Sequence, residues 1–100
     1  MFIVRSLIEI ISQRRRQILV HSYLYYQLNT NVVSDCQYDK WMKELVELQK
    51  KYPDESAKSA YADEFKGFDG STGFDLPFIY PEIQTAGLSL LKEHKRRTNN

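Results

Sequence analysis

The sequence predicts an all-α fold, a helical hairpin with one or two further helices and an ordered loop rich in glycine and aromatic residues. Two stretches of the first half repeat apolar residues at spacings of three and four, the period of an α-helix. A helix start signal stands between these stretches, and the second half holds a glycine-rich segment. With 100 residues the chain has room for one domain, in which we expect the hairpin over residues 1–53 and a short helix, the loop and a C-terminal helix over residues 54–100.

The first helix is predicted from about Phe2 to Leu28. Its apolar residues fall at spacings that place them on one face: Val4, Leu7, Ile8, Ile11, Ile18 and Tyr25. Asn29, Thr30 and Asn31 then end the helix, because short polar side chains compete for backbone hydrogen bonds and tolerate turn geometries.

The second helix has an explicit start signal. Ser34 is placed to cap it and Gln37 completes a capping box, with Val33 and Tyr38 at the positions of a hydrophobic staple. Its apolar seam is Tyr38, Trp41, Leu45, Leu48 and Tyr52. We expect the seam to be buried against Leu7, Ile11, Ile18 and Tyr25 of the first helix. Pro53 ends the helix, because proline lacks the backbone N–H that would continue it.

The second half carries weaker signals. A short helix is expected over Ser56 to Phe65, and the glycines and proline of residues 67–77 indicate a loop. This loop follows no predicted strand and lacks the lysine of a phosphate-binding loop, so we interpret it as a structured turn. Pro81 suits the first turn of a last helix. The apolar residues of that helix share one face: Ile83, Ala86, Leu90 and Leu91. Its C-terminal end, the negative end of the helix dipole, carries the basic residues Lys92, Lys95, Arg96 and Arg97.

Composition and charge exclude several classes of protein. The net charge is only +1, and the consecutive Arg14, Arg15 and Arg16 fan around a helix axis, so nucleic-acid binding is disfavoured. Cys36 is the single cysteine, which excludes an internal disulfide and a cysteine-built zinc site and favours a reducing, cytoplasmic setting. The apolar start of the chain is too short for a membrane span and lacks the charge order of a signal peptide. Self-association into a homo-oligomer would enlarge so small a core, and the sequence leaves it open.

Residues 21–54 carry a specific motif. Paired aromatics, Tyr25 and Tyr26, lead through a short turn to Val-Ser-Asp-Cys-Gln-Tyr-Asp at residues 33–39, and an amphipathic helix then ends in Tyr52-Pro53. This pattern resembles the N-terminal segment that recognises nicotinamide mononucleotide in bacterial NAD-dependent DNA ligases. The resemblance implies that this half of NAD is bound by five matching positions: Tyr25, Tyr26, Asp35, Tyr38 and Asp39. Nothing after Pro53 matches the ligase, whose Lys-x-Asp-Gly motif, zinc cysteines and helix-hairpin-helix repeats are absent, so ligation by this chain alone is excluded.

The chemistry of these residues agrees with the resemblance. Asp35 and Asp39 share a helix face at i,i+4, where their repulsion is offset only by a cation or a donor-rich ligand. The nicotinamide ring of NAD is a cation that can stack on tyrosine, and carboxylates accept hydrogen bonds from ribose hydroxyls. The phosphate needs a donor, for which His21 or one of Arg14 to Arg16 is placed. Each of these residues alone also has a purely structural explanation. The helix dipole favours Asp35 in a first turn, the hydrophobic staple accounts for Tyr38, and core packing accounts for Tyr25. Two carboxylates without a third ligand do not make a metal site.

The leading hypothesis is a non-catalytic module that binds NAD, nicotinamide mononucleotide or an NAD-derived nucleotide, with no catalytic residue, metal or catalytic cofactor. A small bacteriophage protein that sequesters such a nucleotide in host defence is one setting for it. The alternative is a phage-type interaction or inhibitor protein that uses the hairpin as a scaffold for a protein partner. Hydrolysis of the NAD glycosidic bond by Asp35 or Asp39 is the least favoured hypothesis, because a chain this short offers little volume for a closed site. The sequence leaves the identity of the ligand open.

Overall fold

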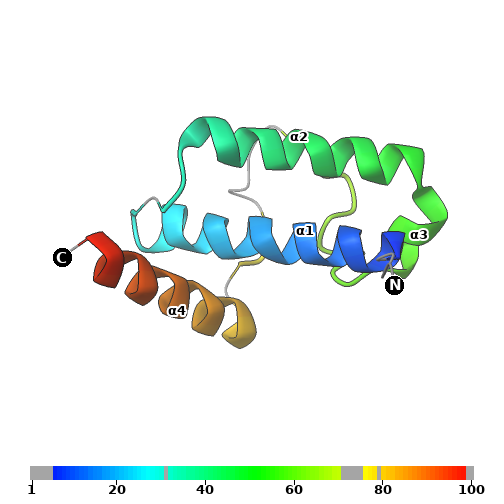
Figure 1. The fold of residues 1–100 in the computed structure, drawn as a ribbon. Coiled ribbons are helices and arrows are strands. Elements are labelled where there is room, and N and C mark those ends of the chain that lie inside the picture. The colour runs from blue at the N-terminus through cyan, green and yellow to red at the C-terminus, as the bar shows by residue number, and fades with distance from the viewer. Residues whose placement is uncertain (1–5, 31, 71–75, 79, 99–100) are drawn as a thin grey trace, which may run out of the picture.

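The structure is a computed structural model, and it describes residues 6–30, 32–70, 76–78 and 80–98. Its elements are α1 (Leu7–Ser22), the π-helical turn η1 (Tyr23–Gln27), α2 (Asp35–Lys51), α3 (Pro53–Lys58) and α4 (Pro81–Thr98). The described residues contain no strand, so the predicted all-α class is confirmed. The predicted hairpin is formed by α1 and α2, and α4 packs on another side of α1 (Figure 1). None of the described helices is both long and apolar enough to cross a membrane.

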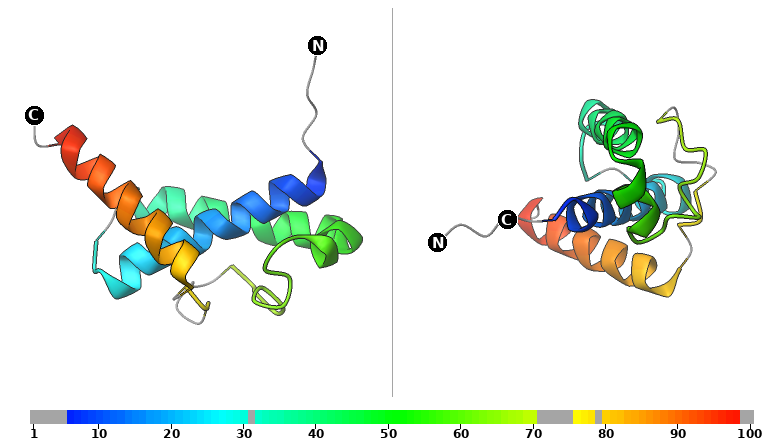
Figure 2. Two further views of the ribbon diagram at one scale, coloured as in Figure 1. Left: turned by 90° about the horizontal axis from the view of Figure 1, so that it is seen from below. Right: turned by 90° about the vertical axis from the view of Figure 1, so that its right-hand side faces the viewer.

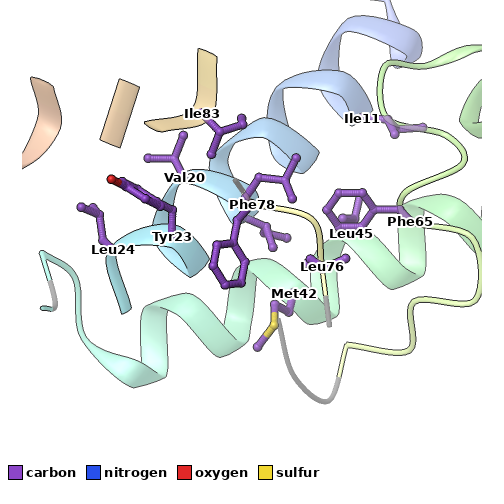
Figure 3. Packing of buried hydrophobic residues seen from close by; sticks show 12 residues of the cluster. Ile11, Val20, Tyr23, Leu24, Met42, Leu45, Phe65, Leu76, Phe78 and Ile83 are labelled. Atoms are coloured by element: carbon purple, nitrogen blue, oxygen red, sulfur yellow. The ribbon is translucent and has the colours of Figure 1, made fainter. Parts of the chain in front are cut away.

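Helix α1 is the centre of the molecule, because it contacts α2, α3 and α4 (Figure 2). The buried residues of α1 therefore cover more of its surface than a single amphipathic stripe. Ile11, Ile18 and Leu19 are fully buried, and Val20 is almost fully buried. Residues from the other elements complete the same core: Met42, Leu45, Phe65, Leu76, Phe78 and Ile83 (Figure 3). The packing thus has three partners around one helix, where the sequence predicted two facing seams.

The C-terminal end of α1 differs from the predicted uninterrupted helix over Phe2 to Leu28. Ser6 caps α1, residues 2–5 lie outside the described residues, and the helix widens into a π turn at Tyr23. In this turn the Leu28 N–H donates to the Tyr23 carbonyl at 3.3 Å, and Asn29 then leaves the helix at φ 50°. Asn31, also expected to end the helix, lies outside the described residues.

The wider turn changes which aromatic residues face the core. A π turn adds a residue to the helical repeat and rotates every side chain that follows it. Tyr23 and Leu24 are consequently buried, whereas Tyr25 is 43% exposed. The predicted burial of Tyr25 in the seam is therefore wrong.

The start of α2 is where the sequence placed it. Ser34 is the N-cap and its Oγ accepts a hydrogen bond from the Gln37 backbone N–H at 3.1 Å, so the predicted boundary is confirmed. The predicted seam is confirmed at Leu45, which is fully buried. The other two buried residues of α2, Met42 and Val46, were not part of the predicted seam. The remaining seam residues, Tyr38, Trp41, Leu48 and Tyr52, are only partly buried.

The segment after α2 departs from the expected helix over Ser56 to Phe65. Helix α3 begins at Pro53, because proline is well suited to a first helical position, and it ends at Lys58. Tyr61 then adopts φ 60°, a left-handed conformation that an α-helix cannot contain. The chain therefore turns through residues 60–67 before it enters the predicted loop, of which residues 71–75 lie outside the described residues.

Helix α4 begins at Pro81 as predicted and packs on α1 and η1. Its Ile83 is fully buried, but Leu90, predicted on the same face, is 37% exposed. The close contact is made at Gly87, where a Cβ atom would lie 2.7 Å from Cδ2 of Tyr23. The missing side chain lets the two helices approach, and this contact was not predicted.

Candidate functional site

A small crevice lies where η1, the loop after it and the first turn of α2 meet. Its polar lining comes from His21, Tyr25, Asp35, Tyr38 and Thr30, and its apolar walls from Leu24, Val32 and Val33. The enclosed volume is about 10 Å³, which is room for about one water molecule. The crevice can therefore hold the edge of a ligand, and the rest of any nucleotide would lie outside it.

Tyr38 presents its ring to the crevice while its hydroxyl points to the core. The hydroxyl is hydrogen-bonded to Oγ of Ser22 at 2.5 Å, and Ser22 is fully buried at the end of α1. Burial raises the pKa of Tyr38 to about 12. The hydroxyl is thus neutral at any physiological pH and already has a partner, so the ring face is what Tyr38 offers a ligand. No sequence pattern had indicated a role for Ser22.

His21 forms part of the inner wall. It is only 9% exposed, and its ring lies 5.1 Å from the Trp41 ring at a tilt of 51°. Burial lowers the pKa of His21 below 6.5, so the imidazole is neutral at neutral pH. A neutral imidazole donates one hydrogen bond and accepts one, but it supplies no positive charge.

The paired tyrosines have different roles. Tyr25 is the exposed ring at the mouth of the crevice. Tyr26 is partly buried and meets Tyr25 edge to face at 4.8 Å, while on its other side it stacks at 6.0 Å on Phe78. Tyr26 does not line the crevice, contrary to the expectation that both tyrosines would. It instead fixes the position of the Tyr25 ring.

The two aspartates are also separated in role. Asp35 is exposed and lines the crevice, whereas Asp39 lines a different, open hollow along α2. The Asp39 carboxylate is paired with Lys43 at 2.8 Å. The cation that offsets the charge of Asp39 therefore comes from the chain itself. The two aspartates, expected to share one helix face, therefore line two different hollows.

Comparison with known proteins places these residues in a family. The family model for the DNA ligase-like, N-terminal NAD+-binding domain matches residues 5–59. The chain belongs to this family. No solved structure matches the chain.

The curated relatives that the chain matches are DNA ligases, and the chain spans less than a tenth of their length. A DNA ligase of Thermotoga petrophila is 42% identical over 52 residues, which are 52% of this chain and 8% of the ligase. One from Thermosipho africanus is 50% identical over 46 residues, 46% of the chain and 7% of the ligase. One from Petrotoga mobilis is 44% identical over 54 residues, 54% of the chain and 8% of the ligase. The match ends where α3 ends, so the family covers the hairpin and not α4.

The arginines of α1 do not line the crevice. Arg14 pairs with Glu44 at 3.2 Å and lies over the Trp41 ring. Arg15 is 2% exposed and donates to Gln49, Ser56 and Ala60 at the other end of the hairpin. The suggestion that Arg14, Arg15 or Arg16 donates to a ligand phosphate is therefore not supported, since none lines the crevice. Within the described part of the chain, no three His, Cys, Asp or Glu side chains are grouped to hold a metal ion.

Proposed function

We propose that this domain binds the nicotinamide mononucleotide half of NAD, or an NAD-derived nucleotide that retains this half. The proposal rests on one observation: His21, Tyr25, Asp35 and Tyr38 line a single crevice at the end of the hairpin. Tyr25, Asp35 and Tyr38 are three of the five positions that the resemblance to the ligase segment implies for binding, and the membership of the family supports the choice of ligand.

The crevice chemistry fits a flat cationic ring with a ribose attached. The exposed Tyr25 ring offers a stacking surface for a pyridinium, worth about 0.5–2 kcal/mol. The exposed carboxylate of Asp35 is a hydrogen-bond acceptor for ribose hydroxyls and adds negative charge beside the ring. Both groups are held by rigid elements, since Tyr26 buttresses Tyr25 and the Ser34 cap fixes the first turn of α2.

We propose binding without catalysis. Hydrolysis of the glycosidic bond needs a carboxylate that holds water against the ribose in a site from which other water is excluded. The crevice encloses about 10 Å³ beside an exposed tyrosine, and its one carboxylate, Asp35, is exposed. A bound nucleotide would be retained unchanged, as expected of a module that carries or sequesters it.

Isothermal titration calorimetry tests the proposal, with NAD, nicotinamide mononucleotide, ADP-ribose and cyclic ADP-ribose as ligands. Asp35→Asn should weaken nicotinamide mononucleotide binding by about 1–2 kcal/mol, the scale of a charge-assisted hydrogen bond. Asp39→Asn is the matched control, because it makes the same change four residues along α2 at a carboxylate paired with Lys43. It should leave the affinity nearly unchanged. Equal losses in the two variants would show that the crevice is not the binding site.

A second candidate function is a scaffold for a protein partner, as in a phage-type inhibitor. The observation in its favour is that α4 exposes two large apolar side chains, Leu88 at 51% and Leu90 at 37%. The calorimetry separates the two candidates. An absence of heat with every nucleotide at millimolar concentration would reject nucleotide binding and leave the scaffold function.

A further inference from the structure

A second hollow with a polar lining lies at the end of the hairpin opposite the crevice. It is formed where the end of α2, helix α3 and the turn after α3 meet α1 (Figure 1). We call it the Arg15 hollow. Its volume is about 420 Å³, which is within the range of small-molecule sites. Its polar lining consists of Arg15, Gln49, Ser56, Asp63 and Lys66.

The guanidinium of Arg15 carries a buried positive charge in the wall of this hollow. Arg15 is 2% exposed, and its hydrogen bonds go to neutral groups: the Gln49 side chain, the carbonyls of Ser56 and Ala60, and the Ser56 hydroxyl. Among the described residues no carboxylate forms an ion pair with it. Burial lowers the pKa of Arg15, and the charge of Glu64 opposes this effect without cancelling it. A buried cation without a counter-ion is costly, so an anion that reached it would be stabilising.

The groups that surround this charge have hydrogen-bond donors left over. Arg15 makes four hydrogen bonds with its five N–H groups, and Nη2 makes only one of them. The Gln49 atom that faces Arg15 must be its oxygen, because arginine has no acceptor, so the two amide N–H groups of Gln49 remain. The Ser56 hydroxyl accepts from Arg15 and keeps its own hydrogen for another acceptor. Within the described part of the chain, these remaining donors have no acceptor.

The turn after α3 adds a second positive charge to the hollow. Lys66 is exposed and lines it, and Asp63 is the one acid in the described lining. Arg15 and Lys66 against Asp63 leave one positive charge in excess. Both turn residues lie beyond residues 5–59, the part that the family model matches, so the shared hairpin alone does not form this hollow.

We propose that the Arg15 hollow binds a phosphate group. The excess of positive charge and of donors requires an anion with several acceptor oxygens, and a charge-assisted hydrogen bond to a guanidinium is strong. With the three N–H groups of Lys66, the remaining donors outnumber the about four acceptor positions of a carboxylate. The three terminal oxygens of a phosphate group accept more hydrogen bonds, which favours phosphate over carboxylate. This site is separate from the crevice, and the inference does not depend on the proposed nicotinamide ligand.

Nuclear magnetic resonance of the ¹⁵N-labelled protein tests the inference, with inorganic phosphate at neutral pH as the probe. We expect saturable shifts of the side-chain N–H signals of Arg15 and Gln49, and no such shifts in sodium chloride or sodium acetate of equal ionic strength. Arg15 itself is kept, because its replacement would also destabilise the fold. Lys66→Gln should weaken phosphate binding about two- to fivefold, the effect of one exposed charge. Lys92→Gln is the matched control, since it removes an exposed lysine of α4 that does not line the hollow, and it should bind phosphate like the unmodified protein.

Several outcomes would overturn the inference. Chloride that reproduces the shifts would show a general salt effect, and acetate that binds as tightly as phosphate would reject the phosphate class. Equal phosphate affinities of the Lys66→Gln and Lys92→Gln proteins would show that the hollow is not the site. Shifts confined to residues of the crevice would place the phosphate elsewhere. No nicotinamide compound is present in this experiment, so each of these outcomes leaves the proposed function to its own test.

Discussion

The two ends of the hairpin use their polar groups in opposite ways. At the end where α2 meets α3, the buried guanidinium of Arg15 donates hydrogen bonds to the Gln49 side chain and to the carbonyls of Ser56 and Ala60. At the other end, the Tyr25 ring and the Asp35 carboxylate are exposed to solvent. At the Arg15 end the polar groups are bonded to one another, which stabilises the fold. At the Tyr25 end the polar groups face solvent, where they can contact a ligand.

Replacing Arg15 should have the largest effect on stability. Arg15→Met removes the donors to two backbone carbonyls and a serine hydroxyl, all in part-buried hydrogen bonds, and an acceptor that is kept from water costs about 1–3 kcal/mol when it loses its partner. We expect a loss of about 3–5 kcal/mol in urea unfolding, a large part of the stability of a domain this small. Arg16→Met is the control, since Arg16 is exposed, and it should change stability little. Similar unfolding midpoints for the two variants would mean that Arg15 does not hold this end together.

Gly87→Ala should have the next largest effect, at the contact between α4 and η1. The new Cβ would lie 2.7 Å from Cδ2 of Tyr23, a buried ring that cannot move freely. Overpacking of this kind costs about 1–3 kcal/mol, and the better helix propensity of alanine returns about 1 kcal/mol of it. Ser89→Ala in the same helix is exposed and should be neutral or slightly stabilising in thermal unfolding. A Gly87→Ala protein as stable as the Ser89→Ala protein would contradict the close packing.

The cap of α2 should contribute less than either contact. Ser34→Ala removes the acceptor of the Gln37 N–H at the crevice end and should cost about 1 kcal/mol in urea unfolding. Ser6→Ala is the matched variant on α1, where Ser6 Oγ accepts from the Glu9 N–H at 3.1 Å. Two caps of the same chemistry should give similar losses. A much larger loss at Ser34 would indicate that its turn also supports the crevice.

The sequence predicted the features that local chemistry determines. The Ser34 cap, the first turn of α4 at Pro81 and the break at Asn29 follow from the residues at those positions alone. The motif at residues 33–39 likewise predicted the family. Each of these features depends on a few neighbouring residues, so a pattern in the sequence is sufficient.

The features that were missed depend on contacts between distant segments. Arg15 is buried because residues 56–60 fold back onto α1, and no periodicity of the first helix indicates this. The exposure of Tyr25 follows from the π turn at Tyr23, which shifts the helical register that the prediction extended to residue 28. The pair between Asp39 and Lys43 is the local exception: the two residues are four apart on α2, a spacing at which opposite charges pair, so the sequence already contained this signal.

The smallest expected effect is a pH dependence from His21 at the crevice end. Burial holds the pKa of His21 in the folded protein below the ordinary 6.5. The unfolded chain therefore takes up this proton first as the pH falls, so the stabilisation is present above pH 6.5 and is lost below it. Unfolding free energy should decline between about pH 7 and pH 5.5, with a slope of at most about 1.4 kcal/mol per pH unit, the value for one proton. His21→Gln should remove this part of the slope, whereas His94→Gln, which removes the other histidine of the chain, should retain it. If both variants kept the same slope in urea titrations, the protonation of His21 would not be what destabilises the fold, and the crevice wall would have to tolerate a charged imidazole.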